Sequence, residues 1–116
     1  MEPTRSPVDV VQRQLDDYNR RDLAAFVANY ADGITVYRLP SLEPAIAGKE
    51  AFARLYETTR FNLPGLRAEL VNRIAFGNKV IDHERVHGLG AEPVEVAAVY
   101  EIAGGLIRTV WFYPAG

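Results

Sequence analysis

The second half of the chain alternates apolar and polar side chains in long segments that are joined by tight turns. Gly77-Asn78 and Gly104-Gly105 are two-residue sequences of the kind that close β-hairpins, and a looser loop, G-L-G-A-E-P, separates the two hairpins. A two-residue turn joins antiparallel strands and fixes which residues face each other across the hairpin. The sequence therefore predicts four antiparallel strands, at residues 66–76, 80–87, 94–103 and 106–113.

The first half of the chain carries helical signals instead. Ser6 can cap a helix that opens at Pro7, and apolar side chains then recur at helical spacing as far as about Asn19. Asp22 is a suitable cap for a second helix, which the turn residues Asp32-Gly33 end. The other elements expected here are a strand at 34–39, a proline-bracketed loop from Pro40 to Pro44, and a third helix that opens at Gly48 and carries Tyr56.

Helices that precede a run of antiparallel strands are typical of an α+β fold, in which the helices pack against one face of a curved sheet. A length of 116 residues suits a single domain with one hydrophobic core. We therefore expect one α+β domain over residues 1–116, in which residues 1–6, ahead of the first helix, are flexible.

Composition excludes several classes of function. A formal net charge of −2 gives no electrostatic case for binding nucleic acid or an anionic membrane surface. The absence of cysteine excludes disulfides and thiolate metal sites. No apolar run approaches the roughly 20 residues of a membrane span, and the N-terminus lacks the apolar core of a signal peptide. A cytoplasmic protein without a metal or cofactor is the expectation.

The Gly104-Gly105 turn predicts how the last two strands face. A two-residue loop at Gly104-Gly105 places Glu101 opposite Arg108, which is a favourable charge pair. The large and aromatic side chains then share the other face, which we expect to be concave and covered by the helices. These inward side chains include Ala98 and Tyr100 on one strand and Thr109, Trp111 and Tyr113 on the other.

The segment 80–87 reads V-I-D-H-E-R-V-H, which puts two carboxylates on one face of a strand and both histidines on the other. The loop that follows this segment does not fix the register in which the segment pairs with the next strand. We therefore use the match of opposite charges to choose the register. If Arg85 lies opposite Glu95, then Asp82 and Glu84 point inward, beside small side chains of the neighbouring strand. The charge match favours this register.

A register slipped by one residue is the alternative. It would turn His83 into the pocket as an acid–base candidate, because a one-residue slip moves every side chain of a strand to the other face. In the favoured register His83 and His87 lie on the outer face, too far apart along the strand to chelate a metal easily.

Four stretches together carry a family resemblance. They read V-V-Q-R-Q-L-D-D-Y-N-R-R-D-L-A-A-F-V-A-N-Y-A-D-G-I-T-V, A-G-K-E-A-F, G-N-K-V and G-G-L-I-R-T-V-W-F-Y, within about Val8 to Tyr113. In them the chain resembles the ketosteroid isomerase and SnoaL-like (polyketide cyclase-like) branch of the nuclear transport factor 2-like superfamily. The resemblance implies a cone-shaped α+β barrel, with three helices on a strongly curved, mainly antiparallel sheet around a deep apolar pocket, and a homodimer formed by the outer sheet faces.

The isomerase residues of that family are not reproduced here. The resemblance places its helical tyrosine on Gln14, its general-base aspartate on Arg38 and its second acid on Ala98. Steroid isomerisation by that machinery is therefore not expected. Its pocket-facing positions do include Asp82, Glu84, Thr109, Trp111 and Tyr113.

Asp82 and Glu84 are the catalytic residues that the sequence predicts. Burial raises the pKa of a carboxyl and a nearby guanidinium lowers it, so one acid can stay protonated while the other is ionised, as proton transfer requires. The side chains expected to contact a ligand are Gln14, Tyr18, Arg38, Tyr56, Tyr100, Thr109, Trp111 and Tyr113.

A structural ion-pair network is the alternative to catalysis. Arg73 pairs with Asp82 across the Gly77-Asn78 hairpin, and Arg38 could neutralise Glu84 or instead bind a ligand carboxylate. Two hypotheses follow for a pocket that binds a small apolar or amphipathic molecule. The protein is either a cofactor-free isomerase, cyclase or dehydratase, or a non-catalytic ligand-binding or dimerisation module.

Overall fold

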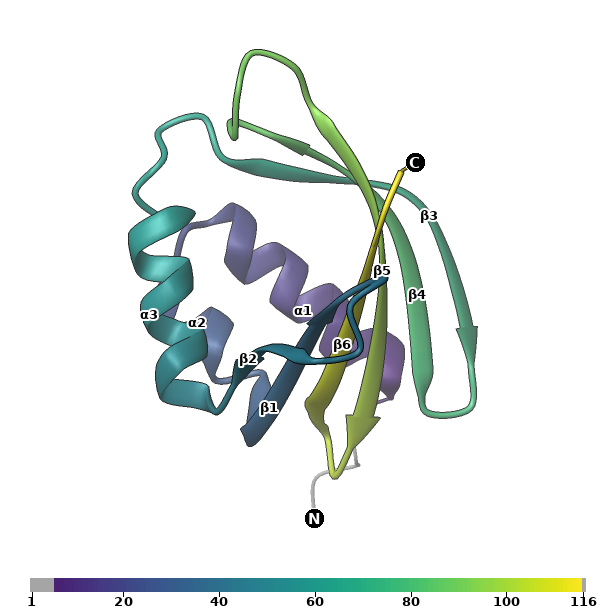
Figure 1. Cartoon of the computed structure of the whole chain (residues 1–116). Helices are drawn as coiled ribbons and strands as arrows, with labels where there is room; N and C mark the ends of the chain where they lie inside the picture. Colours follow the sequence, from purple (N-terminus) through teal and green to yellow (C-terminus); the bar gives the residue numbers. More distant parts are fainter. Residues whose placement is uncertain (1–5, 116) are drawn as a thin grey trace.

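In the computed structural model, which describes residues 6–115, three helices lie on the concave side of a curled six-stranded sheet (Figure 1). The α+β class is confirmed. Of residues 1–6, which were expected to be flexible, only Ser6 lies within the described residues. The helices are α1 (Pro7–Asn19), α2 (Leu23–Val27) and α3 (Lys49–Thr59), and the strands are β1 (Tyr30–Arg38), β2 (Pro44–Ala47), β3 (Arg67–Phe76), β4 (Lys79–His87), β5 (Val94–Ala103) and β6 (Leu106–Pro114).

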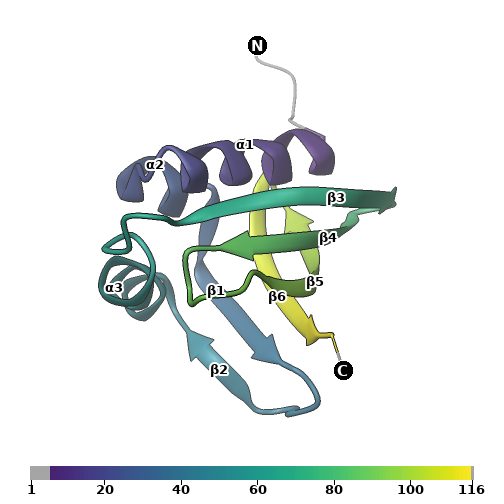
Figure 2. The same ribbon diagram turned by 90° about the horizontal axis from the view of Figure 1, so that it is seen from above.

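The sheet has the strand order β2-β1-β6-β5-β4-β3, so β2 and β3 are its two edges and the barrel is curled rather than closed. All neighbouring strands are antiparallel except β1 and β6, which are parallel. Seen from above, α1 and α2 run along one side of the curl and α3 lies at one end (Figure 2). The amide of Asn19, the last residue of α1, bonds both backbone groups of Ala68 at 2.8 and 2.9 Å, which ties the helix to the edge strand β3.

Two elements of the first half differ from the prediction. The second helix ends at Val27 and Tyr30 already begins a strand, because the backbone there pairs with β6: the Ile107 N–H donates to the Asn29 carbonyl at 2.9 Å. The expected loop between the prolines contains the short strand β2. Pro44 is tolerated as its first residue because an edge strand leaves that backbone position without a required donor.

The core lies between the helices and the sheet. It contains a cluster of aromatic rings that come from all three helices and from β1, with ring centroids of Tyr30 and Phe52 4.4 Å apart and those of Phe26 and Tyr56 5.1 Å apart. Tilted contacts of this kind add to the free energy of burial. The cluster fixes the positions of the helices and leaves a cavity between it and β4 and β5.

The register of β4 is the favoured one. Arg85 pairs with Glu95, and Glu84 with Val96. Asp82 pairs with Ala98 and is fully buried, and Glu84 is 6% exposed. The slipped register is thereby excluded, and the exposed His83 lies on the outer face, where its Nε2 is 2.9 Å from Glu95.

The facing predicted for the last strand is wrong. Ile102 pairs with Ile107 as expected, but Glu101 then pairs with Thr109, so Arg108 is an extra residue in a β-bulge. The bulge shifts the rest of β6 by one residue. It turns Val110 and Phe112 inward and places Thr109, Trp111 and Tyr113 on the outer face, where Trp111 stacks on Tyr37 with ring centroids 6.1 Å apart.

The charge pair that suggested the hairpin register survives the bulge. Glu101 accepts from the Arg108 Nε at 3.1 Å and also from the Thr109 hydroxyl at 3.0 Å. One carboxylate on β5 is therefore satisfied by both residues at the bulge, which stabilises the shifted register. No helix within residues 6–115 is long and apolar enough to cross a membrane.

Candidate functional site

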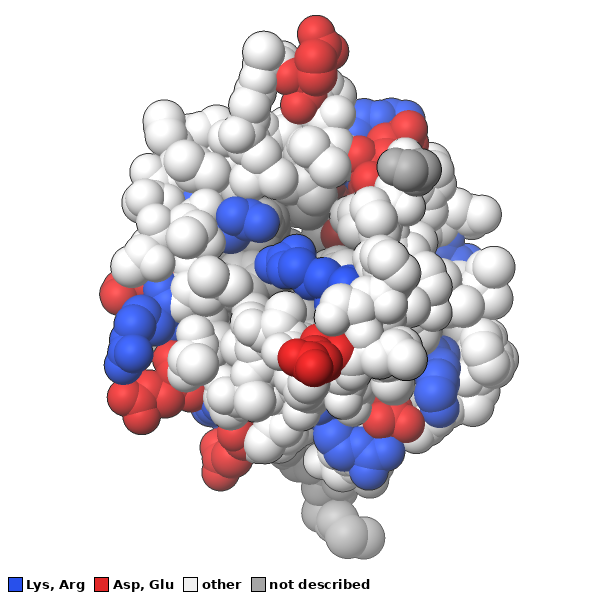
Figure 3. All heavy atoms as spheres, in the orientation of Figure 1, with Lys and Arg blue, Asp and Glu red and all other residues white. Residues whose placement is uncertain are grey.

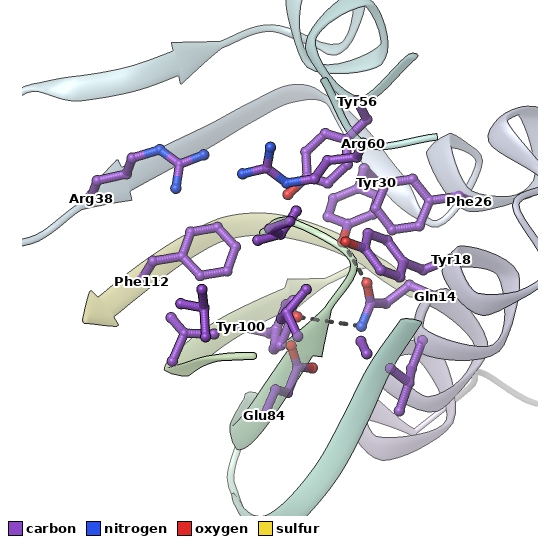
Figure 4. Close-up of a pocket in the computed structure, with 16 residues that line it drawn as sticks. Gln14, Tyr18, Phe26, Tyr30, Arg38, Tyr56, Arg60, Glu84, Tyr100 and Phe112 are labelled. Carbon is purple, nitrogen blue, oxygen red and sulfur yellow. Dashed lines mark hydrogen bonds between the residues drawn. The ribbon is translucent and has the colours of Figure 1, made fainter. Parts of the chain in front are cut away.

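A pocket of about 140 Å³ opens between the concave face of the sheet and the helices (Figure 4). Five of the predicted ligand contacts line it, and so does Glu84. The bulge in β6 removes Thr109, Trp111 and Tyr113 from it and supplies Phe112 instead. The five are Gln14 and Tyr18 from α1, Arg38 from β1, Tyr56 from α3 and Tyr100 from β5.

Glu84 is the one acid of the pocket lining. Its Oε2 atom is buried without any hydrogen-bond partner among the described residues. Burial raises the pKa of this carboxyl to about 7; the neighbouring Asp82 carboxylate adds to the rise and the Arg73 guanidinium opposes it. A carboxyl with this pKa is present in both protonation states near neutral pH, so it can give or take a proton.

Asp82 occupies a different environment from Glu84, although both point inward. The Arg73 guanidinium donates to it through two nitrogens, Nε at 2.7 Å and Nη2 at 2.9 Å, as predicted across the hairpin. Arg73 Nη1 also donates to Gln12 of α1 at 2.9 Å. Asp82 is not part of the pocket lining. Its fully engaged oxygens fit the structural network that was the alternative for this residue.

Gln14 connects two buried tyrosines at the back of the pocket. The Tyr30 hydroxyl donates to Gln14 Oε1 at 2.8 Å, and Gln14 Nε2 faces the Tyr100 oxygen at 3.4 Å (Figure 4). The amide donates to Tyr100, so the phenol keeps its own proton available for a ligand in the pocket. Burial raises the pKa of the Tyr100 hydroxyl well above its ordinary value, so it acts as a neutral donor.

Two arginines lie at the mouth of the pocket. Arg38 is at the end of β1 and its guanidinium carbon is 5.5 Å from the centre of the Phe112 ring, a cation–π geometry. Arg60 caps the C-terminal end of α3. The two side chains point toward one another in Figure 4, and Figure 3 shows basic side chains on either side of a hollow. Arg38 does not neutralise Glu84, since no ion pair joins them in residues 6–115.

The pocket residues that the sequence does not predict include Tyr30, Phe112 and Arg60. The sequence pattern assigns Tyr30 to the second helix rather than to β1, and Phe112 is inward only because of the bulge. Arg60 follows α3 in a stretch without a recognisable pattern; its position after an amphipathic helix is the only signal that could have suggested it. Within the described range no group of three metal-ligating side chains comes together.

Comparison with known families matches residues 11–110 to the SnoaL-like domain. The chain belongs to this family. Comparison with curated proteins finds no match. The resemblance inferred from the sequence is thus confirmed at the level of the family, and the match spans α1 to β6.

Solved structures similar to this SnoaL-like chain have the nuclear transport factor 2-like fold. A cystatin-fold protein from Novosphingobium aromaticivorans is 22% identical with a TM-score of 0.84, covering 93% of this chain and 97% of its own. A candidate ketosteroid isomerase from Kribbella flavida is 19% identical with a TM-score of 0.81, covering 95% and 78%. A candidate polyketide cyclase from Sinorhizobium meliloti is 20% identical with a TM-score of 0.77, covering 90% and 93%. At identities below 25%, the structural similarity to these proteins shows a common fold and nothing more.

Proposed function

We propose that this SnoaL-like protein binds a small, mainly apolar molecule in the pocket and catalyses a proton transfer on it, with Glu84 as general acid–base catalyst. The observation that carries the proposal is the Glu84 carboxyl, which is buried in the pocket lining with one oxygen unpartnered and a pKa of about 7. Proton transfer of this kind underlies isomerase, cyclase and dehydratase reactions, and it needs no cofactor.

The surrounding residues suit such a reaction. In the proposed step the ionised Glu84 removes a proton from a carbon next to a carbonyl group, and the Tyr100 hydroxyl donates a hydrogen bond to the carbonyl oxygen as negative charge develops there. Glu84 then returns the proton to another atom of the same molecule. Gln14 orients Tyr100 rather than touching the reacting atoms. Asp82 raises the proton affinity of Glu84 and stays outside the cavity.

The size of the cavity limits the substrate. Its volume of about 140 Å³ is close to that of an engineered cavity of about 150 Å³ that binds benzene. A molecule with one ring fills it. A four-ring steroid skeleton is larger than this volume, and the isomerase residues are replaced by Gln14, Arg38 and Ala98, so a substrate smaller than a steroid is proposed.

Solvent exchange tests the catalytic proposal. Small cyclic ketones incubated with the protein in D₂O are expected to gain deuterium beside the carbonyl faster than in buffer, as measured by NMR. Glu84→Gln should lower the enzyme-dependent rate about 100-fold, since general acid–base catalysis contributes on the order of 10²–10⁴. The matched control is Glu57→Gln, an exposed acid of α3. An equal rate in wild type and Glu84→Gln would contradict the proposal.

The second candidate is a non-catalytic ligand-binding module. It is favoured by the Arg73–Asp82 pair, in which an inward-facing carboxylate is bound by an arginine and lies outside the pocket lining. Ligand binding that survives Glu84→Gln, together with no protein-dependent exchange for any ketone, would support this alternative.

We also propose that two copies of the chain pair through their outer sheet faces. One row of residues across five strands is apolar: Ile74 pairs with Ile81, Ile81 with Val99, Val99 with Trp111, and Trp111 with Tyr37. Ile74 is 56% exposed in the single chain. The other four side chains of the row are partly exposed, and a contiguous apolar surface that reaches solvent is typical of a protein–protein interface.

Ile74→Glu tests the dimer because it puts a charge in the apolar row without touching the core. A buried unpaired charge is costly, so the dissociation constant should rise about 100-fold, as measured by analytical ultracentrifugation. Leu42→Glu is the control, since Leu42 is 84% exposed in the loop between β1 and β2. A wild-type monomer, or an Ile74→Glu variant that dimerises as tightly as wild type, would contradict the interface.

A further inference from the structure

We propose that the ligand of this pocket is a carboxylate: Arg38 and Arg60 bind its anionic group at the mouth, and its apolar body extends inward toward Glu84. The inference rests on the proposed function, because it names the class of molecule that the same pocket takes. It does not depend on the reaction that Glu84 performs.

The two guanidinium groups converge although they come from separate parts of the chain. Arg38 ends β1 and Arg60 follows α3, and both line the pocket. Their side chains point toward one another across its mouth (Figure 4). Both also lie near enough to Tyr56 to act on its hydroxyl: burial raises the pKa of Tyr56, and the charges of Arg38 and Arg60 oppose that rise.

Among the described residues Arg38 and Arg60 have no carboxylate partner, unlike the arginines that the structure pairs with acids. The other arginines without an ion pair within residues 6–115 do not line this pocket; they are Arg13, Arg21 and Arg67. Arg73 pairs with Asp82, Arg85 with Glu69 and Glu95, and Arg108 with Glu101. Within residues 6–115 neither Arg38 nor Arg60 forms an ion pair. An anion placed between two guanidinium groups that point toward one another is attracted by both.

The contacts that the two arginines do make leave donors for a ligand. The guanidinium carbon of Arg38 is 5.5 Å from the centre of the Phe112 ring, and within residues 6–115 the Arg38 side chain donates no hydrogen bond to another residue. Arg60 uses Nη1 for the carbonyl of Thr59 at 3.0 Å. The planar guanidinium fork matches the two oxygens of a carboxylate, and two forks can hold one anion from both sides.

Charge in the pocket is segregated between its two ends. Arg73 is the basic group that lowers the pKa of Glu84, against the rise caused by burial. Arg38 and Arg60 form no ion pair with Glu84 within residues 6–115. A molecule with a carboxylate at one end and a ring at the other places its anion between the arginines and its apolar body in the cavity, and a volume of about 140 Å³ takes a single ring.

Calorimetric titration of the whole protein with phenylacetate tests the inference, with phenylacetamide as the neutral isostere and phenyl phosphate as the other anion. Phenylacetate should bind at least 10-fold more tightly than phenylacetamide, and more tightly than phenyl phosphate. Arg38→Gln and Arg60→Gln should each weaken the binding of phenylacetate about 10-fold, because each removes charge-assisted hydrogen bonds to the carboxylate.

The matched control is Arg54→Gln, which removes an exposed arginine of α3 that is paired with Glu50. It should leave phenylacetate binding unchanged. Equal affinity for phenylacetate and phenylacetamide, no binding of phenylacetate, or equal losses in Arg54→Gln and Arg38→Gln would each overturn the carboxylate site. Preference for phenyl phosphate would also overturn it.

The same samples separate this inference from the proposed function. Carbon-13 NMR of the side-chain carboxyls follows the titration of Glu84, and ketone exchange follows its chemistry; neither requires a carboxylate ligand. If carboxylates fail to bind while Glu84 titrates near neutral pH and exchange persists, the carboxylate site is wrong and the proposed function stands. If carboxylates bind through Arg38 and Arg60 while Glu84→Gln leaves exchange unchanged, the site stands and the catalytic proposal is wrong.

Discussion

Replacing Arg73 with alanine is expected to lower the free energy of unfolding by about 4 kcal/mol, because it leaves a buried carboxylate without its counter-charge. Asp82 is fully buried, and both of its oxygens accept from the Arg73 guanidinium, at 2.7 and 2.9 Å. The same change also removes the bond from Arg73 to Gln12, which links β3 to α1. Urea denaturation at pH 7, followed by circular dichroism, measures the loss.

An exposed ion pair provides the control for Arg73→Ala. Arg54 and Glu50 pair at 3.1 Å on the surface of α3, with side chains 70% and 89% exposed. Arg54→Ala should therefore change the free energy of unfolding by about 0.5 kcal/mol or less. A loss below about 1 kcal/mol in Arg73→Ala would mean that Asp82 finds water or another donor, and it would contradict the view that this pair holds the hairpin to the helix.

The stability of the wild-type protein is expected to fall as the pH rises, through the titration of Glu84. Burial raises the pKa of this carboxyl from 4.5 to about 7 in the folded state. Between these two pH values the folded state keeps a proton that the unfolded state has lost, so stability decreases with increasing pH. The contribution is fully present below about pH 4.5 and lost above about pH 7, and it amounts to about 3 kcal/mol.

Glu84→Gln removes this pH dependence and is the variant that isolates it. Its free energy of unfolding should approach that of wild type near pH 4.5 and exceed it by about 3 kcal/mol at pH 8, because the buried amide never ionises. Urea denaturation of both proteins across this range measures the difference. Glu57→Gln, on the exposed face of α3, should run parallel to wild type. Parallel curves for wild type and Glu84→Gln would show that Glu84 titrates normally.

These two effects have one structural origin in the inner face of β4. Asp82 and Glu84 are two residues apart on the same face, and only one of them has an arginine partner. The partnered acid contributes stability, whereas the unpartnered acid reduces stability at neutral pH and keeps a proton available in the pocket. A buried group that reduces stability in this way is typical of a functional site.

The approximate boundaries of the last four strands, β3 to β6, and the β4 register are local properties that the sequence alone determined. The tight turns at Gly77-Asn78 and Gly104-Gly105 fix which strands pair, and opposite charges at Arg85 and Glu95 distinguish the correct register from its one-residue slip. Because these signals act between neighbours, they sufficed to place Asp82 and Glu84 inward and both histidines outward.

Only the tertiary structure decided which residues complete the pocket. Both faces of the last strand are apolar or aromatic, with Val110 and Phe112 on one and Trp111 and Tyr113 on the other, so alternation could not reveal the bulge at Arg108. Likewise, the approach of Arg60 to Arg38 depends on how α3 packs against β1. Such contacts join distant parts of the chain through packing, and no local pattern of charge or hydrophobicity encodes them.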